Sequence, residues 1–221
     1  VDDVRETFYP EWNRRGLWNR NYSESRVPEV PTMLLEMLSH QNFADMRLGH
    51  DPRFRYTVSR AIYKGMLRYL ATVNDFEYIV QPLPVEEFST RFLSDSTIEL
   101  RWKDIHDKLE PTAKPDSYIV YTRMNDGGFD NGILVKEAKL KMKIKTGTVY
   151  SFKVEAVNKG GKSFPSEILS VYKAPNSQPV VLIVNAFNRI SGPESFTEGV
   201  EMAGFNDIFD AGVPYIADIS Y

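Results

Sequence analysis

Few side chains of this 221-residue chain are suited to chemistry. Cysteine is absent, which excludes disulfides and thiolate metal ligands, and there are only three histidines. Glu36 stands out because it ends the apolar run Pro31–Glu36, which is typical of a buried strand. Open α/β sheets place ligands at the carboxyl ends of their strands, so Glu36 is a candidate site residue. The alternative is that Glu36 is only the polar residue that ends a strand.

The three histidines do not suggest a metal site. His40 and His50 are ten residues apart, which matches no common zinc pattern. We expect both to be solvent-facing or hydrogen-bonded loop residues. His106 lies among charged residues, and we expect it at the surface.

A helix is expected directly after this region. Asp51 is a suitable cap, and Pro52 suits the first turn because its missing N–H group is not needed there. Apolar residues then recur at helical spacing, and cations are expected to cover the other face. The apolar positions are Phe54, Val58, Ala61, Ile62, Met66 and Tyr69, and the cations are Arg53, Arg60, Lys64 and Arg68. Strand, loop and helix together predict the closing unit of an α/β domain.

The first 75 residues resemble a known hydrolase family. The run Val-Pro-x-x-Leu-Leu-Glu, with Asn42 and Asp45 following Glu36, is similar to the closing motif of zinc-dependent N-acetylmuramoyl-L-alanine amidases. The resemblance continues through Phe54-Arg55, 60–65 and Arg68-Tyr69, which are similar to the last helix of that family. Leu38-Ser39 stands where the family has Gly-Phe, so we expect a loop of different shape beside the carboxylate.

The resemblance implies roles for these residues. Glu36 would be the general acid/base beside a zinc-bound water, with Asn42 and Asp45 supporting the motif. The family's zinc ligands are two His and a Glu upstream of this motif, and residues 1–30 contain no His. We therefore expect zinc in the complete protein, and no metal bound to this chain. The chain starts at Val1 without a leader, so we interpret it as a piece of a larger protein.

The N-terminal region also mixes arginine with aromatic residues. Such a mixture can bind glycans or single-stranded nucleic acid, or can simply pack and form surface ion pairs. The arginines are Arg14, Arg15, Arg20 and Arg26, and the aromatic residues are Trp12, Trp18 and Tyr22. Several acidic residues in the same stretch argue against a groove for a polyanion. A net charge of −3 gives no sign of nucleic-acid binding, and no apolar run is long enough to span a membrane.

Charge composition predicts three segments. Residues 1–78 are rich in Arg and balanced in charge, residues 79–175 are rich in Lys, and residues 176–221 are acidic. We assign 1–78 to the C-terminal part of an amidase-like α/β domain, 79–175 to a β-sandwich, and 176–221 to the start of a further, incomplete α/β domain.

The middle segment has the pattern of an antiparallel sandwich. Strands are expected at Thr97–Trp102, Tyr118–Thr122 and Val149–Val157, with glycine turns at Asp126-Gly127-Gly128 and at Lys159–Lys162. Leu100-x-Trp102 and the sequence from Gly147 to Ser163 resemble the fibronectin type III family. That resemblance implies that Tyr150 is the corner tyrosine. It says little about activity, because such sandwiches have many functions.

Five lysines alternate along one strand region of the sandwich. They are Lys136, Lys139, Lys141, Lys143 and Lys145. They would share a face, either as protection of an edge strand or as a contact for an acidic glycan.

The third segment opens with the apolar run Pro179–Phe187, which predicts a strand buried in a parallel sheet. Asn185, Asn188 and Arg189 are candidate polar site residues at its end. The arrangement resembles multidomain bacterial envelope proteins, some of which carry an amidase label and others a xanthan lyase label.

These observations lead to one main hypothesis and two alternatives. The main hypothesis is a fragment of an exported amidase that acts on peptidoglycan or another cell-envelope glycan, in the periplasm or at the cell surface. The first alternative is a non-catalytic spacer or binding module. The second is part of an extracellular polysaccharide lyase, although no suitable base and cation can be assembled by spacing.

Overall fold

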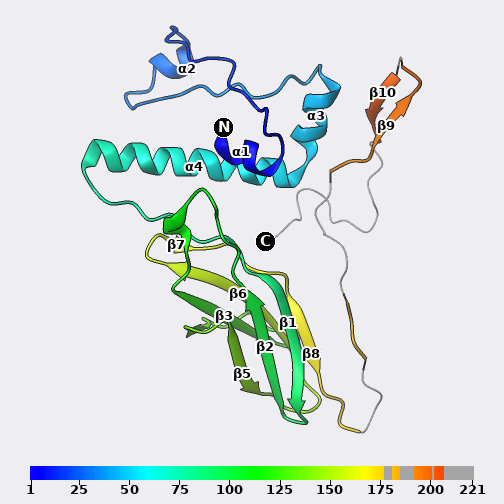
Figure 1. Ribbon diagram of the computed structural model, residues 1–221. Coiled ribbons are helices and arrows are strands. Elements are labelled where there is room, and N and C mark those ends of the chain that lie inside the picture. The colour runs from blue at the N-terminus through cyan, green and yellow to red at the C-terminus, as the bar shows by residue number, and fades with distance from the viewer. Residues whose placement is uncertain (177–180, 185–191, 201, 207–221) are drawn as a thin grey trace. The chain divides into compact units, whose positions relative to one another are not determined.

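The computed structural model describes residues 1–176, 181–184, 192–200 and 202–206. The chain divides into two compact units (Figure 1). The helical unit comprises Val1–Gly65 together with Ala186–Ile219, of which 192–200 and 202–206 are described. The sandwich unit comprises Met66–Asn185. No helix in the part of the chain that the structure describes has the length and apolar character needed to cross a bilayer.

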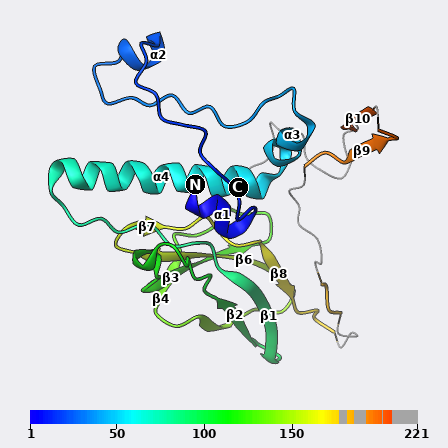
Figure 2. The ribbon, with the colours of Figure 1, turned by 45° about the horizontal axis from the view of Figure 1, so that its top comes forward.

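The sandwich unit contains two antiparallel sheets (Figures 1 and 2). One sheet has the order β1-β2-β5, formed by Glu86–Ser94, Thr97–Lys103 and Lys139–Lys143. The other has the order β4-β3-β6-β7, with β8 also paired to β6. Its strands are β3 Ser117–Met124, β4 Ile133–Val135, β6 Val149–Asn158, β7 Gly161–Lys162 and β8 Leu169–Tyr172. A single 3-10 turn, η1, covers Pro111–Ala113.

Alternation along the strands builds the sandwich core, as the sequence predicts. From β2, Ile98, Leu100 and Trp102 are buried, and from β6 the side chains of the even-numbered residues from Tyr150 to Ala156 are buried. The hydroxyl of Tyr150 accepts a hydrogen bond from the Lys145 N–H group at 3.2 Å, which confirms the corner tyrosine. The predicted sandwich is therefore correct in its strands and its inward face.

The helical unit has a much smaller core. Its helices are α1 Asp2–Thr7, α2 Ser23–Arg26, α3 Phe43–His50 and the first part of α4 Pro52–Asn74. Val4, Phe54 and Val58 are its buried apolar residues, and the rings of Phe8 and Trp12 pack on Phe54 at centroid distances of 5.4 and 5.6 Å. The core thus joins α1 and the following loop to α4.

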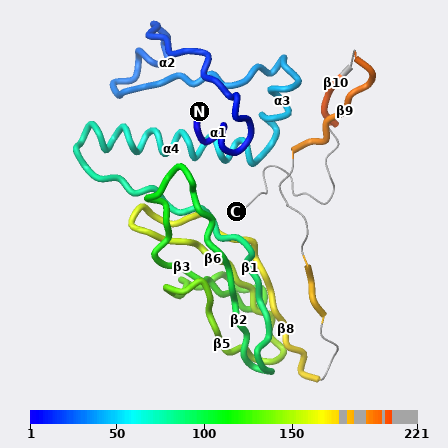
Figure 3. The backbone as a smooth tube through the Cα atoms, viewed as in Figure 1, coloured from blue at the N-terminus to red at the C-terminus, as the bar shows by residue number. Residues whose placement is uncertain are grey.

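The strand expected at Pro31–Glu36 is absent. Residues 31–39 lie outside helices and strands, on the segment that connects α2 to α3 in Figure 3. The side chains of residues 31–37 are exposed. Met33 retains 66% of its accessible surface and Leu35 47%. A strand needs a neighbour for its backbone hydrogen bonds, and no described strand pairs with this segment.

Helix α4 forms at the predicted place, but its buried face differs from the expected one. Met66 and Tyr69, expected inside, are exposed, whereas Arg60 and Lys64, expected outside, are buried. Lys64 is held there by an ion pair with Asp3 of α1. The described core of the helical unit includes Phe54, Val58 and Ile62 of α4. It includes no residue of α4 beyond Ile62.

The third segment also differs from its prediction where it is described. Residues 181–184 of the expected buried strand are exposed and lie outside any strand. The rest of Pro179–Phe187 lies outside the described residues, as do Asn185, Asn188 and Arg189. Farther along, β9 Ser195–Glu198 and β10 Met202–Phe205 pair as an antiparallel hairpin. The ring of Phe205 lies 5.3 Å from Phe43 and 4.8 Å from His50.

Candidate functional site

Glu36 lies on the exposed segment between α2 and α3. Its side chain is open to solvent, and it makes no ion pair with any described residue. An exposed carboxylate can accept a proton from water and can be reached by a large polymeric substrate.

Asn42 and Asp45 fix the chain that follows Glu36. Asn42 caps α3, because its side-chain oxygen accepts hydrogen bonds from the N–H groups of Ala44 at 2.9 Å and Asp45 at 3.3 Å. Asp45 reaches back, and its carboxylate accepts the Ser39 N–H group at 2.9 Å. The two side chains therefore close a loop that starts three residues after Glu36, an arrangement similar to a capping box.

The connection from α3 to α4 is equally well defined. Asp51 accepts the Arg53 N–H group at 2.8 Å and also binds the Arg53 guanidinium, as expected of a cap. Burial tends to raise the pKa of Asp51, but its hydrogen bonds with Arg53 outweigh this and lower it. Arg55 donates to the carbonyl of Gly49 at 2.7 Å, which ties the start of α4 to the end of α3.

The histidines and acids of the described residues do not assemble a metal site. Within the residues that the structure covers, no group of three or more His, Asp or Glu side chains is arranged so that it could hold a metal ion. His40 and His106 are exposed, whereas His50 ends α3 and packs edge-on against Phe205. A zinc ion therefore finds no ligand set among the described residues, and no chemical step of this chain is derived through one.

The arginine and aromatic residues near the N-terminus divide into two groups. Trp12 belongs to the core of the helical unit, and its carbonyl accepts a hydrogen bond from Arg5 at 2.6 Å. Trp18 and Tyr22 are exposed, and the Arg15 guanidinium lies 6.0 Å from the Trp18 ring centroid. Packing thus explains Trp12. Trp18 and Tyr22 are the residues of this group to which the hypothesis of a glycan contact still applies.

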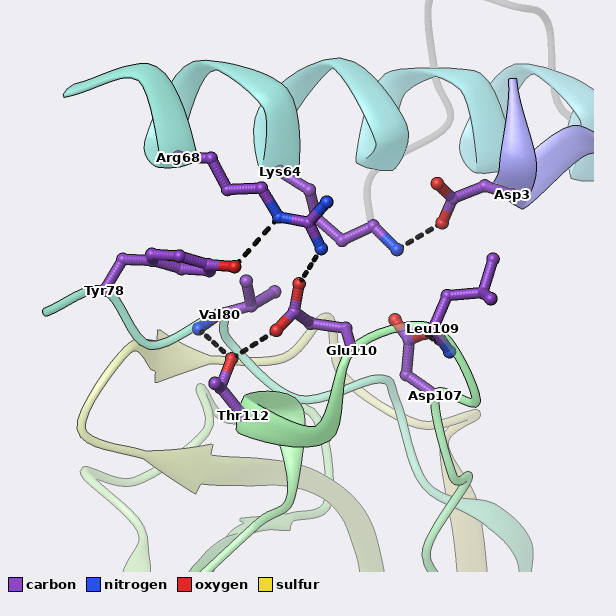
Figure 4. Close-up of polar contacts among 9 residues, drawn as sticks. All are labelled: Asp3, Lys64, Arg68, Tyr78, Val80, Asp107, Leu109, Glu110 and Thr112. Carbon is purple, nitrogen blue, oxygen red and sulfur yellow. Dashed lines mark hydrogen bonds and ion pairs between the residues drawn. The ribbon is translucent and has the colours of Figure 1, made fainter. Parts of the chain in front are cut away.

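A polar cluster that sequence reasoning did not predict lies at one end of the sandwich unit. Glu110 is buried and accepts hydrogen bonds from Arg68 at 2.7 Å and from the Thr112 hydroxyl at 2.7 Å (Figure 4). Arg68 also donates to the hydroxyl of Tyr78 at 2.9 Å, and the Val80 N–H group donates to Thr112 at 3.1 Å. These contacts attach the last turns of α4 and the following linker to the sandwich. No local motif predicts them, because Arg68 and Glu110 are 42 residues apart.

Asn158 completes this end of the sandwich. Its side-chain amide donates to the carbonyls of Val80, Thr112 and Lys114, at 2.9, 3.1 and 3.3 Å. Its oxygen accepts the Gly160 N–H group at 2.8 Å, which shapes the predicted glycine turn. The cluster has a structural role, because every polar group in it is directed at another part of the same unit.

The lysine run lies on β5. Lys139, Lys141 and Lys143 alternate with the half-buried Leu140 and Met142, so the predicted shared face is confirmed for these three. Lys136 and Lys145 lie outside the strand.

Comparison with known proteins identifies the sandwich. Residues 83–172 match the family described as fibronectin type III domain, and these residues form such a domain. Among curated proteins no relative is found.

Solved structures with a similar fold are distant. The twitchin kinase region from C. elegans is 20% identical over 45% of this chain and 18% of its own length, with a TM-score of 0.39. Titin domains A168–A170 are 23% identical over 42% of this chain and 32% of theirs, with a TM-score of 0.38. The FN5 domain of Drosophila Lar is 18% identical over 43% of this chain and 99% of its own, with a TM-score of 0.33. At these scores the likenesses carry no argument about function.

Proposed function

We propose that this chain, whose residues 83–172 form a fibronectin type III domain, is part of a bacterial cell-wall amidase. The bond cleaved would be the amide between the lactyl group of N-acetylmuramic acid and L-alanine in peptidoglycan. The observation that carries the proposal is the spacing of Glu36, Asn42 and Asp45, together with the loop that the last two close. That spacing is similar to the closing motif of the amidase family.

Glu36 has the role of general acid/base in this proposal. Amide hydrolysis requires that a proton be taken from the attacking water and given to the leaving amine. A carboxylate can do both in turn. Asn42 and Asp45 fix the loop between Ser39 and α3 by hydrogen bonds. This fixed loop, which starts three residues after Glu36, supports a defined position for Glu36 when a substrate is bound.

The proposal places catalysis in a longer protein. Zinc belongs to the proposed complete enzyme, and this chain alone is expected to be inactive, since the zinc ligands of the family lie upstream of this motif and residues 1–30 contain no His. The partner is peptidoglycan or another cell-envelope glycan, and the location is the periplasm or the cell surface. The fibronectin type III domain is compatible with a secreted, multidomain protein.

The test compares two acids of the same exposed segment in the complete protein. Glu36→Gln should lower the release of L-alanine-linked peptides from purified peptidoglycan by at least about 10²-fold. Glu29→Gln, which changes the charge by the same amount, should leave it unchanged. Peptide release would be followed by chromatography of the new amino termini. Equal activity of the two variants would contradict the role of Glu36.

A second candidate function is a non-catalytic spacer or binding module. It is favoured by the sandwich, which is complete in its own core while carrying charged outer faces. If it is correct, Glu36→Ala leaves hydrolysis unchanged. If the chain is instead part of a polysaccharide lyase, the complete protein should release unsaturated products that absorb in the near ultraviolet.

A further inference from the structure

The outer face of the β1-β2-β5 sheet concentrates positive charge. Register pairing sets Ser89, Arg101 and Lys139 side by side in one row across the three strands. The next row contains Arg91, Glu99 and Lys141, and Thr97 faces Lys143 in the third. The basic face is defined here as Arg91, Arg101, Lys103, Lys139, Lys141 and Lys143.

Acidic residues neutralise only part of this face. Glu99 is buried beneath two guanidinium groups, and it accepts hydrogen bonds from Arg91 at 2.6 Å and from Arg101 at 2.7 Å. Lys103 pairs with Glu87, and Lys139 pairs with Glu137. Among the described residues Lys141 and Lys143 form no ion pair, so β5 presents two uncompensated ammonium groups.

Protection of an edge strand explains the lysines of β5 but not the rest of the face. Lysines on β5 alone would be enough to deter pairing with another chain. Arg101, however, lies on the central strand directly opposite Lys139, so the positive charge extends beyond the edge strand. Glu99 and Glu137 pair with these two cations, whereas Lys141 and Lys143 have no acidic partner among the described residues. An anion bound over β5 would supply that partner.

Two shallow hollows in the surface share Lys139 in their lining. One hollow of about 430 Å³ is lined by Glu87, Ser89, Arg101, Trp102, Lys103, Ala138 and Lys139. A second of about 400 Å³ is lined by Val135, Lys136, Glu137, Lys139, Leu140 and Lys141. Both hollows are open to solvent, and both include residues of the edge strand β5 in their lining.

The charge spacing indicates which polymer fits. Residues on one face of a strand are about 6.7 Å apart, so β5 offers one cation at that interval. Double-stranded DNA carries one charge per about 1.7 Å, and the net charge of this chain is −3, so a dense polyanion is poorly matched. The rows contain no aromatic side chain on which a base could stack. Carboxylates carried one per sugar ring form a much less dense row of charge than the phosphates of a duplex, and they are therefore the better match to β5.

We propose that the basic face of the fibronectin type III domain binds an acidic polysaccharide whose charge comes from uronate carboxylates. Lys141 and Lys143 contact the carboxylates, and the hollows beside Lys139 receive the sugar rings. This site is separate from Glu36, and its existence does not depend on the amidase proposal.

The experiment measures binding of size-fractionated polygalacturonate to the whole chain by calorimetry at about 0.15 M salt. The double variant Lys141→Gln/Lys143→Gln should weaken binding about tenfold. The control Lys114→Gln/Lys159→Gln removes the same charge from exposed positions outside the face and should leave the affinity unchanged. The variant Lys141→Arg/Lys143→Arg keeps the charge and should retain binding, which separates a lost contact from a damaged edge strand.

Three results would overturn the proposal. They are no binding by the unaltered chain, an equal loss in the two glutamine variants, and tighter binding of polyphosphate than of polygalacturonate. Because the readout is binding alone, a negative result here leaves the test of Glu36 in peptidoglycan hydrolysis unaffected.

Discussion

The sandwich unit and the helical unit differ in how much of their apolar sequence they bury. The sandwich encloses twelve buried residues in one cluster, and alternating positions on the strands of both sheets contribute to it. Among the described residues of the helical unit the core cluster has three buried members, while the segment 31–37 leaves methionines and leucines in contact with solvent. Strand pairing within the unit is what separates the two cases. Each sandwich strand has a partner in the same unit, whereas the described residues provide none for 31–37.

The largest effect is expected from removing one phenylalanine ring from each core. Phe152 and Phe54 are both almost fully buried. Phe152→Ala should lower the free energy of unfolding of the sandwich unit by about 3–5 kcal/mol. Phe54→Ala should have an effect at the lower end of that range, since partly exposed neighbours such as Leu38 and Ile62 can collapse into the space. Hydrogen exchange resolved by mass spectrometry reports both units, and a larger loss at Phe54 would reverse the comparison.

Buried polar contacts should also matter more in the sandwich. Asn158→Ala removes hydrogen bonds to three main-chain carbonyls, and we expect a loss of about 2–3 kcal/mol. Asn13 of the helical unit makes a comparable hydrogen bond, to the Glu11 carbonyl, but in an exposed position. Asn13→Ala should change stability by less than about 0.5 kcal/mol. Denaturant titration of the two variants measures the difference, and equal losses would show that burial is not what distinguishes these asparagines.

Acid should weaken the sandwich through Glu99. Hydrogen bonds from Arg101 and Arg91 lower the pKa of Glu99 from its ordinary value of 4.5. The unfolded chain therefore takes up this proton first, so the stabilisation is complete above pH 4.5 and is lost as the pH falls through the lower folded value. In Glu99→Gln, the dependence of unfolding on pH below 4.5 should be shallower. Urea unfolding at several pH values measures it, and an unchanged pH dependence would contradict the assignment.

A smaller effect is expected at the cap of α3. Asn42→Ala removes the acceptor for two N–H groups and should cost the helical unit about 1 kcal/mol. Asn42→Asp keeps an acceptor and should cost much less. Circular dichroism during thermal unfolding would report both variants. A full loss with aspartate would mean that the amide nitrogen, and not the cap, is what matters.

The same contrast explains what the sequence could predict. Ile98, Leu100 and Trp102 could be predicted as buried because alternation within one strand fixes the inward face, and β1, one of the two partners of β2, directly precedes it in the chain. The cap residues Asp51 and Asn42 are similarly local, although for Asn42 the sequence suggested only support of a motif. Arg68 and Glu110 could not be paired in advance, since their contact depends on how the linker folds. Met66 fits the helical period of the apolar positions, yet its side chain is exposed in the structure.

The smallest effect is expected at Leu34, and it tests whether the segment 31–37 is exposed or buried. Leu34 lies in the run whose pattern predicted burial, yet it keeps 45% of its accessible surface. Leu34→Ala should therefore change the stability of the helical unit by less than about 0.5 kcal/mol, whereas Leu100→Ala in the sandwich should cost about 2–5 kcal/mol. A loss above 2 kcal/mol at Leu34, measured by the same denaturant titration, would mean that the segment is packed in solution as its sequence pattern predicts. In that case the two units would differ in the size of their cores and no longer in whether their apolar runs find partners.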